Sequence, residues 1–210
     1  MAKFDLHIHT HYSKCGLDSP KTIVKIAISK KLDGIAITDH NTTVGALQAM
    51  RNNQELTVIP GTEVSTKDGE ILGLGITQRL PEGRSAQETI DLIRDRGGIA
   101  VIPHPYDLLR NSIGFRMKAL KFDAVEVYNS NLVLPFANRL ARRAAEKEGY
   151  STVAGSDAHI GTAVGNAYTI IDETDVEDIL EAIRKNRTEV YGRPTRFLTK
   201  IRRKALSMLR

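Results

Sequence analysis

The histidines of this chain are confined to four short segments, in each of which an apolar run ends in polar residues. β-Forming residues lead directly into His, or into Asp together with His, in segments 4–11, 35–41, 100–105 and 153–159. A strand that ends in ligand-type side chains delivers them to one end of a sheet or barrel. The repetition therefore predicts a metal site at the point where several strands end.

The bulk composition is that of a globular domain. A chain of 210 residues with 41% hydrophobic residues is long enough to bury a core, and we expect one main domain. No apolar run is long enough to span a bilayer, and Asp5 and His7 interrupt any signal-like apolar stretch at the N-terminus. One cysteine, Cys15, excludes an internal disulfide, so a reducing, cytoplasmic location is expected.

The formal net charge of +5 is concentrated at the C-terminus. Seven of the 30 basic residues lie in 193–210, where no acidic residue occurs, and the remaining 23 face 25 acidic residues. The high pI is therefore no evidence for a body that binds nucleic acid. Phe197, Ile201, Ala205 and Met208 share one face of a helical tail, which predicts a basic C-terminal helix over 193–210 packed on the domain. A surface for RNA or acidic lipid is the alternative.

Strand and helix patterns alternate along the chain. The predicted strands are 4–9, 34–38, 57–63, 70–76, 99–102, 124–127, 152–154 and 168–171. Predicted helices begin after Ser19-Pro20, which pairs an N-cap with a first-turn proline, and after Ser85, which forms a capping box with Glu88. Further helices are expected over 42–51, Pro135–Glu148 and 176–185. This order predicts an α/β fold with a mainly parallel sheet that closes, or nearly closes, into a barrel.

Pairs of potential ligands stand two residues apart or side by side. His7 and His9 face the same side of a strand, so both imidazoles could bind one ion. Asp39-His40 and Asp157-Ala158-His159 follow later strands. Each pair taken alone could be a hydrogen-bonded polar pair at a strand end, but one shared site explains all of them together.

Three further candidate ligands lie in predicted strands or directly after them. Glu63 ends a strand, and a carboxylate there could bridge two ions about 3.5–4 Å apart. His104 lies between two prolines, so its backbone is expected to be extended and stiff. Glu126 lies between two strand valines, which favours a role as a ligand or as a partner of a ligand. An ion pair with an arginine is the alternative for Glu126.

These segments together resemble the PHP (polymerase and histidinol phosphatase) family of metal-dependent phosphoesterases. The resemblance rests on Asp5–Thr10, Thr38–Asn41, Pro60–Glu63, Pro103–Pro105 and Gly155–His159, in the family's order, and on Val125–Asn129. It spans roughly residues 3–171 and implies a distorted (β/α)7 barrel with two or three divalent ions, Zn²⁺, Mn²⁺ or Fe²⁺. The phosphoesterase domain would then be 1–192.

The resemblance also implies a ligand set. His7, His9, Glu63 and Asp157 would hold one ion, Glu63 would bridge to a second held with His104 and Glu126, and His40 and His159 would hold a third. Asp39 would orient His40 or a bound water, which places Glu63, Asp39 and His40 at the chemistry. The family's usual Asp-Gly after the first histidine pair is missing here. Either Cys15, as a thiolate, or Asp18 would replace that aspartate.

Three cationic side chains are candidates for binding substrate. Arg110 and Arg116 lie in an irregular stretch after His104 and could bind a second phosphate, although loop arginines are commonly solvated. His11 could contact a phosphate or be exposed.

The resemblance favours a nucleotide or a short RNA or DNA as the phosphorylated substrate, hydrolysed by a nucleoside bisphosphate phosphatase or 5′–3′ exonuclease-like activity. The alternatives are a phosphatase for another small phosphomonoester, such as histidinol phosphate, and a metal-stabilised binding module without turnover. No obligate protein partner is indicated.

Overall fold

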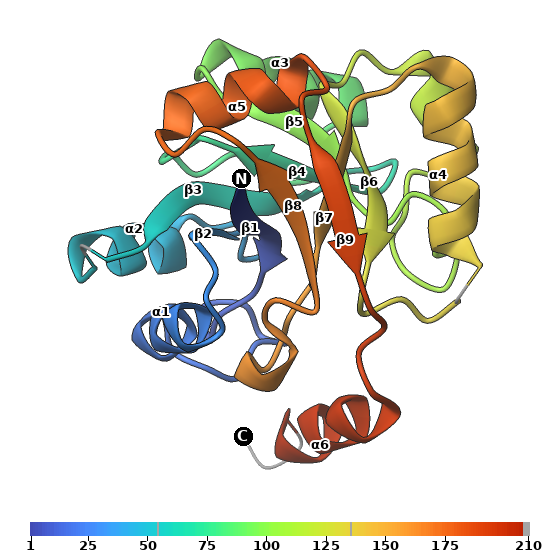
Figure 1. Cartoon of the computed structure of the whole chain (residues 1–210). Coiled ribbons are helices and arrows are strands. Elements are labelled where there is room, and N and C mark those ends of the chain that lie inside the picture. The colour runs from blue at the N-terminus through green and yellow to red at the C-terminus, as the bar shows by residue number, and fades with distance from the viewer. Residues whose placement is uncertain (54, 135, 208–210) are drawn as a thin grey trace.

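The computed structural model describes residues 1–53, 55–134 and 136–207, which form one nine-stranded sheet with helices outside it (Figure 1). The strand order is β7-β6-β5-β4-β3-β2-β1-β8-β9. The strands are β1 (Ala2–Ile8), β2 (Gly34–Ile37), β3 (Thr57–Ser65), β4 (Glu70–Leu74), β5 (Ile99–Ile102), β6 (Ala124–Asn129), β7 (Thr152–Gly155), β8 (Ala167–Ile171) and β9 (Glu189–Gly192).

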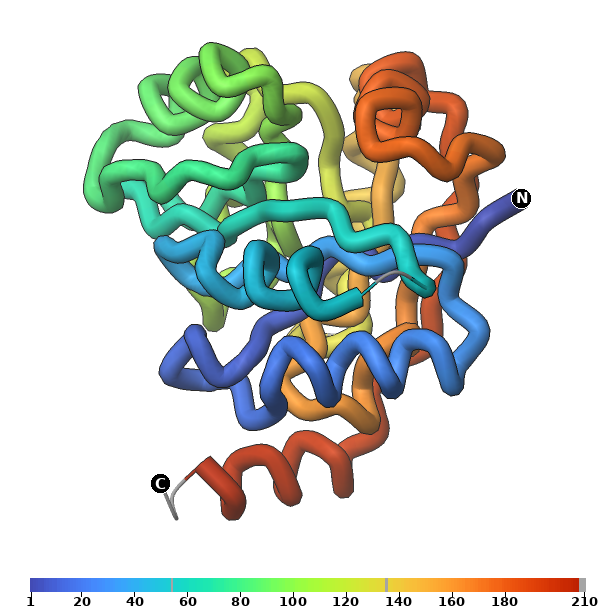
Figure 2. Tube along the Cα trace, turned by 90° about the vertical axis from the view of Figure 1, so that its left-hand side faces the viewer, coloured from blue at the N-terminus to red at the C-terminus, as the bar shows by residue number. Residues whose placement is uncertain are grey.

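The helices lie around this sheet, with one set apart from it. They are α1 (Pro20–Ser29), α2 (Val44–Arg51), α3 (Ala86–Asp95), α4 (Ala137–Glu148), α5 (Val176–Arg184) and α6 (Phe197–Ser207), with short 3-10 helices at Gly114–Ala119 and Gly161–Ala163. In Figures 1 and 2, α6 lies below the sheet, beyond the end to which β1 points. In the part of the chain that the structure describes, no helix is both long and apolar enough to cross a membrane.

The sheet curves until β7 approaches β1 and β8. A parallel bridge joins Ile8 to Ala158, just beyond β7. Thr169 Oγ1 accepts a hydrogen bond from Ala154 N at 2.9 Å and donates one to Ala154 O at 3.0 Å. These contacts nearly close the barrel without a regular ladder between the first and last strands, and the fold class predicted from the sequence is confirmed.

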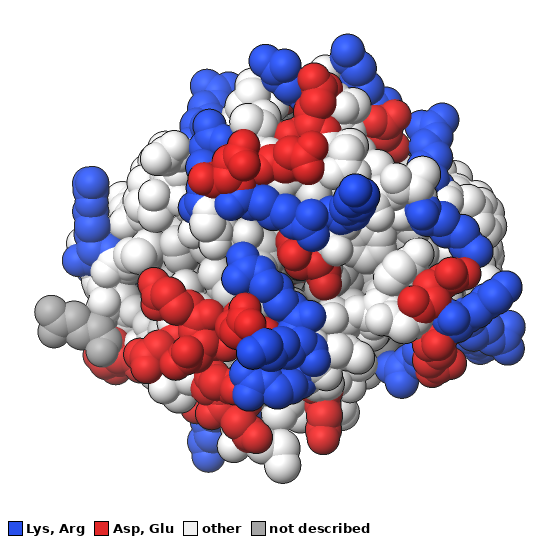
Figure 3. Space-filling view, turned by 90° about the horizontal axis from the view of Figure 1, so that it is seen from above, with Lys and Arg blue, Asp and Glu red and all other residues white. Residues whose placement is uncertain are grey.

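The internal cluster of the barrel blocks one of its two ends. Phe4, Leu6 and Leu72 are buried inside the sheet, and Ile179 and Ile183 of α5 belong to the same cluster. Helix α5 therefore covers the upper end in Figure 1, where the parallel strands begin. Seen from above, that end shows positive and negative side chains intermixed (Figure 3). The lower end, where these strands finish, is left for the polar site.

Capping residues in the sequence predicted the ends of three helices correctly. Ser19 Oγ accepts from Thr22 N at 3.1 Å, and Ser85 forms the predicted capping box with Glu88. Gly149 ends α4 with φ 72°, a left-handed conformation that suits glycine. The predicted start of this helix at Pro135 lies outside the described residues; its described part begins at Ala137.

The structure corrects the sequence analysis in its strand directions. Strands β1–β3 and β5–β7 are parallel, but β4 is antiparallel to both of its neighbours, and β8 is antiparallel to β1 and β9. The β3–β4 connection is a short hairpin around the predicted Asp68-Gly69 turn, so no crossover helix separates these strands. The alternating pattern did not reveal β9.

The packing of the tail on the domain stays a prediction, supported by a hydrogen bond of 2.7 Å from Lys200 Nζ to the backbone carbonyl of Leu132. Helix α6 forms where predicted, but none of its residues is buried, and Phe197 and Ile201 are 75% and 48% exposed. Met208 and Arg210 lie outside the described residues. The boundary at residue 193 stays a prediction; β9 ends at Gly192.

Candidate metal centre

Strand ends bring the predicted side chains together at the end of the barrel that faces α6. His7 is in β1 and His9 directly follows it, His104 follows β5, and Asp157 and His159 follow β7. His40, after β2, forms a parallel bridge with Glu63 of β3. All of these except His40 are at least 95% buried, and His40 is half-buried.

Glu63 is the centre of the cluster. Its Oε2 lies 3.2 Å from His9 Nε2, 3.3 Å from His40 Nδ1 and 3.5 Å from His7 Nε2. Its Oε1 lies 3.1 Å from His104 Nε2. One fully buried carboxylate therefore faces four imidazoles from three different segments.

Asp157 is a second carboxylate that faces the imidazoles of His7 and His9. Its Oδ1 lies 3.4 Å from His9 Nε2, 3.7 Å from His7 Nε2 and 3.3 Å from His159 Nδ1. Arg110 Nη1 donates to its Oδ2, as does Asn129 Nδ2 at 3.1 Å. Asp157 thus has one oxygen held by protein donors and one turned to the imidazoles.

Partners outside the cluster fix the orientation of two histidines. His7 Nδ1 lies 3.1 Å from Glu126 Oε1, and His104 Nδ1 lies 3.2 Å from Ser112 Oγ. The Ser112 hydroxyl donates to backbone carbonyls, so the His104 ring donates to Ser112. When the outer nitrogen carries the proton, Nε2 presents a lone pair to the interior, as metal-binding histidines do.

Asp39 contacts the loop that follows β1. Its carboxylate accepts hydrogen bonds from Thr10 N at 2.7 Å, from Thr10 Oγ1 at 2.6 Å and from Ser13 Oγ at 2.7 Å, and no contact with the His40 ring is found among the described residues. Ser13 Oγ in turn lies 3.3 Å from His9 Nδ1. Asp39 therefore fixes the loop that orients His9 and does not touch His40's imidazole.

Glu70 is a member of the cluster that the sequence analysis missed. It begins β4, across the hairpin from the end of β3, and its oxygens lie 3.6 Å from His40 Nδ1 and 3.7 Å from His104 Nε2. The available signal was a single acidic residue directly after a tight turn. Only the register of the hairpin shows that it points at Glu63.

The buried charges of the cluster shift one another's pKa values. Burial opposes protonation of His7 and His9, but Asp157 and Glu63 outweigh it, holding the pKa of His7 well above its usual range and raising that of His9 to about 9. Burial would raise the pKa of both carboxylates, but neighbouring cations outweigh it. His7 and His104 hold the pKa of Glu63 well below its usual range. Arg110 and His7 do the same for the pKa of Asp157. The cluster thus attracts positive charge.

His40, His159 and Glu70 are held neutral. Burial lowers the pKa of His40 to about 4 and, together with the charge of His9, holds the pKa of His159 well below its usual range. Burial and the neighbouring Glu63 raise the pKa of Glu70 to about 8. Neutral imidazoles beside ionised carboxylates form a donor set suited to a divalent cation.

The unpaired oxygens of the cluster provide a direct test of this fit. Glu63 Oε2 and Asp157 Oδ1 are buried and have no hydrogen-bond partner. A buried carboxylate oxygen without a donor is costly unless a cation balances it. Three sets of side chains offer ligand atoms close enough to share an ion: His7, His9 and Glu63; His40, Glu63 and Glu70; and His9, Cys15, His40 and His159. The residues fit a multinuclear metal site.

The structure separates the two candidates for the missing aspartate. Cys15 Sγ belongs to the set with His9, His40 and His159. Asp18 Oδ2 accepts a hydrogen bond from Gly161 N at 2.7 Å, and Asp18 is in none of the three sets. Asp18 is therefore placed as a loop anchor, and Cys15 is the member of the pair at the cluster.

Backbone conformation departs from expectation at one ligand. His104 has φ 29° and Asp157 has φ 50°, both in the left-handed region that non-glycine residues rarely adopt. The predicted extended backbone at His104 is therefore wrong: its N–H turns toward Glu126 Oε2, 2.9 Å away. Strained positions of this kind concentrate at functional sites.

Of the three candidate substrate-binding residues, the structure brings one to the cluster. Arg110 is mostly buried and contacts Asp157. Arg116 is 71% exposed and lies 3.9 Å from Asp68, and no contact with the cluster is found for it in the described ranges. His11 is exposed, and its ring centroid lies 4.6 Å from that of Tyr12.

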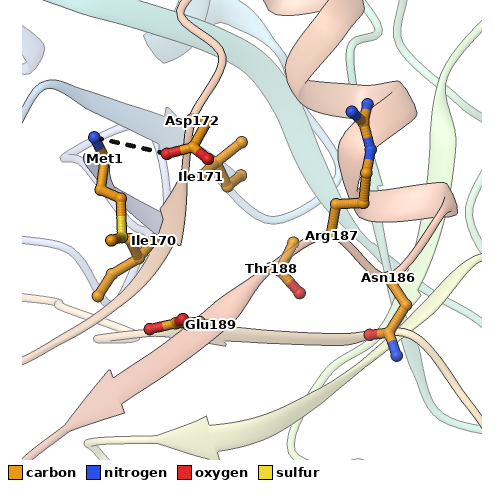
Figure 4. Close-up of a pocket in the computed structure, with 8 residues that line it drawn as sticks. All are labelled: Met1, Ile170, Ile171, Asp172, Asn186, Arg187, Thr188 and Glu189. Atoms are coloured by element: carbon orange, nitrogen blue, oxygen red, sulfur yellow. Dashed lines mark ion pairs between the residues drawn. The ribbon is translucent and has the colours of Figure 1, made fainter.

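Two hollows open from the cluster to the surface. One, of about 460 Å³, lies between Cys15, His40, His159, Arg110 and the side chains of α6; the other, of about 860 Å³, extends from Cys15 and His40 along 41–44. A third hollow, of about 330 Å³, lies at the opposite end (Figure 4). There the Met1 ammonium faces Asp172 at 3.5 Å, and Arg187 points away from Thr188 and Glu189. No His or Cys lines it.

Comparison with known proteins identifies the family. Residues 135–188 match the family model described as PHP-associated. A two-domain protein from Bacteroides vulgatus that contains a predicted PHP-like metal-dependent phosphoesterase superimposes with a TM-score of 0.77 at 19% identity, over 91% of this chain and 64% of that one. This chain belongs to the PHP family. PsfC from Pseudomonas syringae superimposes on this chain with a TM-score of 0.71 and 19% identity, over 98% of both chains.

Sequence relatives of this PHP protein differ in how much they cover. An uncharacterised protein from Methanocaldococcus jannaschii is 37% identical over 158 residues, 70% of this chain and 92% of that protein. The 5′-3′ exoribonuclease Rnm of Salmonella typhimurium is 38% identical over 96 residues, 41% of this chain. This match spans only 32% of Rnm, and the Bacteroides match spans less than two thirds of its chain.

Proposed function

We propose that this protein is a metal-dependent phosphoesterase that uses two or three divalent ions. The observation that carries the proposal is the buried carboxylate of Glu63, which faces four imidazoles and has an oxygen with no donor. Zn²⁺, Mn²⁺ and Fe²⁺ suit mixed imidazole and carboxylate ligands. Family membership supports the same reaction class.

The geometry supports a division of the ligands among the ions. His7, His9 and Asp157 would share one ion with Glu63 Oε2, which also faces His40. His104 faces the other oxygen, Oε1, and Glu70 lies near both His40 and His104. Cys15 and His159 complete a set with His9 and His40. Glu126 and Asp39, expected as a ligand and as a catalytic group, are better explained as positioning residues that orient His7 and His9.

The roles of the protein groups follow from their contacts. Bound divalent ions supply Lewis acidity and lower the pKa of water. Glu126, Ser112 and Ser13 hold the protons on the outer nitrogens of His7, His104 and His9, so a metal ion would bind these rings through their inner nitrogens and displace the inner protons of His7 and His9. Arg110 brings a permanent positive charge to the cluster, where it would bind phosphoryl oxygens of the substrate.

A nucleotide or a short oligonucleotide is the proposed substrate. Support comes from the partial match to the exoribonuclease and from a second partial match, 34% identical over 37% of this chain, to the phosphoribosyl 1,2-cyclic phosphate 1,2-diphosphodiesterase of Eggerthella lenta. Both relatives act on ribose phosphates, according to their names. Histidinol phosphate or another small phosphomonoester is the second candidate substrate.

A phosphate-release screen tests the proposal. The protein, supplemented in turn with Zn²⁺, Mn²⁺ or Fe²⁺, is incubated with mononucleotides, nucleoside 3′,5′-bisphosphates, 5′-phosphorylated oligonucleotides and histidinol phosphate. We expect phosphate release that a chelator abolishes and the metal restores. Absence of turnover on every ester, with metal bound, would favour a non-catalytic binding module.

A further inference from the structure

The C-terminal helix α6 turns a polar side toward the barrel. Only Thr199, Lys200 and Arg203 of this helix are half-buried, and its other residues are exposed. Lys200 Nζ donates to the backbone carbonyl of Leu132, and Arg203 Nε is shielded from solvent. The helix therefore meets the domain through its polar and cationic side.

The apolar side of the same helix faces away from the domain. At about 100° of rotation per residue, four apolar residues share an arc of about 100° opposite the half-buried side: Phe197, Leu198, Ile201 and Ala205. Phe197 and Leu198 are 75% and 76% exposed, and Ile201 is 48% exposed. A helix that packs on its own domain buries its apolar stripe. Here the stripe is presented outward, where a partner outside the chain can cover it.

Exposed cations border this apolar stripe on both sides. Lys204 lies about 20° before Phe197 around the helix axis, and Arg202 lies about 40° beyond Leu198. Residues 193–210 hold seven basic residues and no acidic one. Apolar side chains flanked by Lys and Arg are typical of helices that lie in the interface of a membrane with anionic lipids, where the cations reach the lipid phosphates.

Neighbouring loops extend the exposed apolar surface beside α6. Val133 is 52% exposed and lines the same hollow as Phe197. The Asp107 carboxylate accepts a hydrogen bond from Val133 N at 2.8 Å, and the next two residues, Leu108 and Leu109, are 65% and 68% exposed. Exposed apolar side chains thus gather at the end of the barrel where α6 is the lowest element in both views (Figures 1 and 2).

We propose that α6 is a docking surface for a membrane that contains anionic lipids. The helix lies in the plane of the membrane interface, with Leu198 and Ile201 at the acyl chains and the flanking cations at the lipid phosphates. A second copy of this chain fits less well, because two paired stripes would bring the flanking cations of both helices together. A single-stranded RNA would use the cations and leave the aliphatic side chains uncovered. The inference does not depend on the proposed hydrolysis, since docking needs neither metal nor substrate.

Co-sedimentation of the full-length protein with vesicles tests the docking. The protein should bind vesicles of phosphatidylcholine and phosphatidylglycerol in equal parts but not vesicles of phosphatidylcholine alone, and rising salt should weaken the binding. In L198Q/I201Q the affinity should fall at least about 10-fold, because two side chains no longer enter the apolar layer. The matched control F136Q/L140Q removes two part-exposed apolar side chains at α4 and should bind as the wild type does.

The same assay tests the flanking cations. In R202Q/K204Q the affinity for the mixed vesicles should fall about 10- to 30-fold, since each cation near an anionic surface contributes about fivefold. The matched control R142Q/R143Q removes the same charge from exposed positions on α4, and its affinity should stay within about threefold of the wild type. Circular dichroism and an unchanged melting temperature would show that each variant is folded.

A tryptophan probe reports whether the apolar stripe enters the membrane. The chain has no tryptophan, so Leu198→Trp gives a single emission. On the mixed vesicles this emission should shift to shorter wavelength and should be quenched by brominated lipid, because the indole enters the apolar layer. Met50→Trp, at an exposed position on α2, should show neither change.

The outcomes distinguish the possible occupants of this surface. Vesicle binding that is unchanged in L198Q/I201Q, or reduced equally by both charge variants, would overturn the proposal. A wild type that binds polyuridylate but not the vesicles would make the tail an RNA surface, and a dimer without vesicle binding that L198Q/I201Q dissociates would make it an interface between copies. Vesicle binding without phosphate release from any ester would retain the docking and overturn the proposed hydrolysis.

Discussion

Glu63→Gln is the substitution that most sharply perturbs the proposed site. It preserves the shape of the side chain and removes one negative charge from a buried position that is 3.1–3.5 Å from four imidazole nitrogens. At 3.2 Å, with an effective dielectric constant of about 20, one unit of positive charge is attracted by about 5 kcal/mol. Burial of the carboxylate offsets part of this energy, so we expect a net loss of about 3 kcal/mol for each ion that Glu63 contacts.

That loss corresponds to a decrease of about 100-fold or more in metal affinity, and of at least about 100-fold in turnover, because misplaced catalytic groups have effects of this size. Competition with a chromogenic chelator measures affinity, and phosphate release at saturating metal and substrate measures turnover. Glu146→Gln, an exposed position on α4, is the matched control, and His11→Ala tests a histidine outside the cluster. Equal losses in Glu63→Gln and either control would refute the reasoning.

Three further predictions test the electrostatics, the third ligand set and the packing around the site. Metal loading of the chelator-treated protein at pH 7 should release about two to three protons, because the raised pKa values of His7, His9 and Glu70 leave these groups protonated without metal. The affinity for metal should therefore fall as the pH decreases from about 9. A pH-stat titration measures the proton release, and metal binding without proton release at pH 7 would contradict the assigned charge states. Cys15→Ser should lower the number of ions bound per chain, whereas Asp18→Asn, which alters a loop contact to Gly161, should not; the reverse result in elemental analysis would make Asp18 the ligand. Gly155→Ala would place a Cβ 2.4 Å from His7 Cβ, so overpacking should cost about 2–3 kcal/mol and lower the melting temperature by about 5–10 °C. In Gly83→Ala, where a Cβ meets no atom within 4 Å and only the positive φ opposes it, the loss should be about 1 kcal/mol; equal melting temperatures for the two variants would argue against close contact of β7 with β1.

Much of the fold could be predicted because its signals are local. The Ser19 and Ser85 caps and the Gly149 helix end depend on residues within one turn, and all three form as expected. The antiparallel direction of β4 and the existence of β9 depend on contacts between distant segments, which an alternation of apolar runs does not encode.

The candidate site shows the same limit. The strand ends predicted that His7, His9, Glu63, His104, Asp157 and His159 would converge, and the structure brings them together. Glu70 was missed because its role depends on hairpin register. The contacts of Asp39 with Thr10 and Ser13 depend on the path of a neighbouring loop, which the strand-end pattern does not encode. The position of α6 over the entrance depends on the path of the chain after β9, which the amphipathic pattern alone cannot define.

The metal content of the purified protein tests the central claim most directly. Elemental analysis after gentle purification and supplementation with Zn²⁺ or Mn²⁺ should find about two to three transition-metal ions per chain, as a site with a bridging carboxylate requires. Fewer than about one ion per chain after supplementation would contradict the multinuclear site.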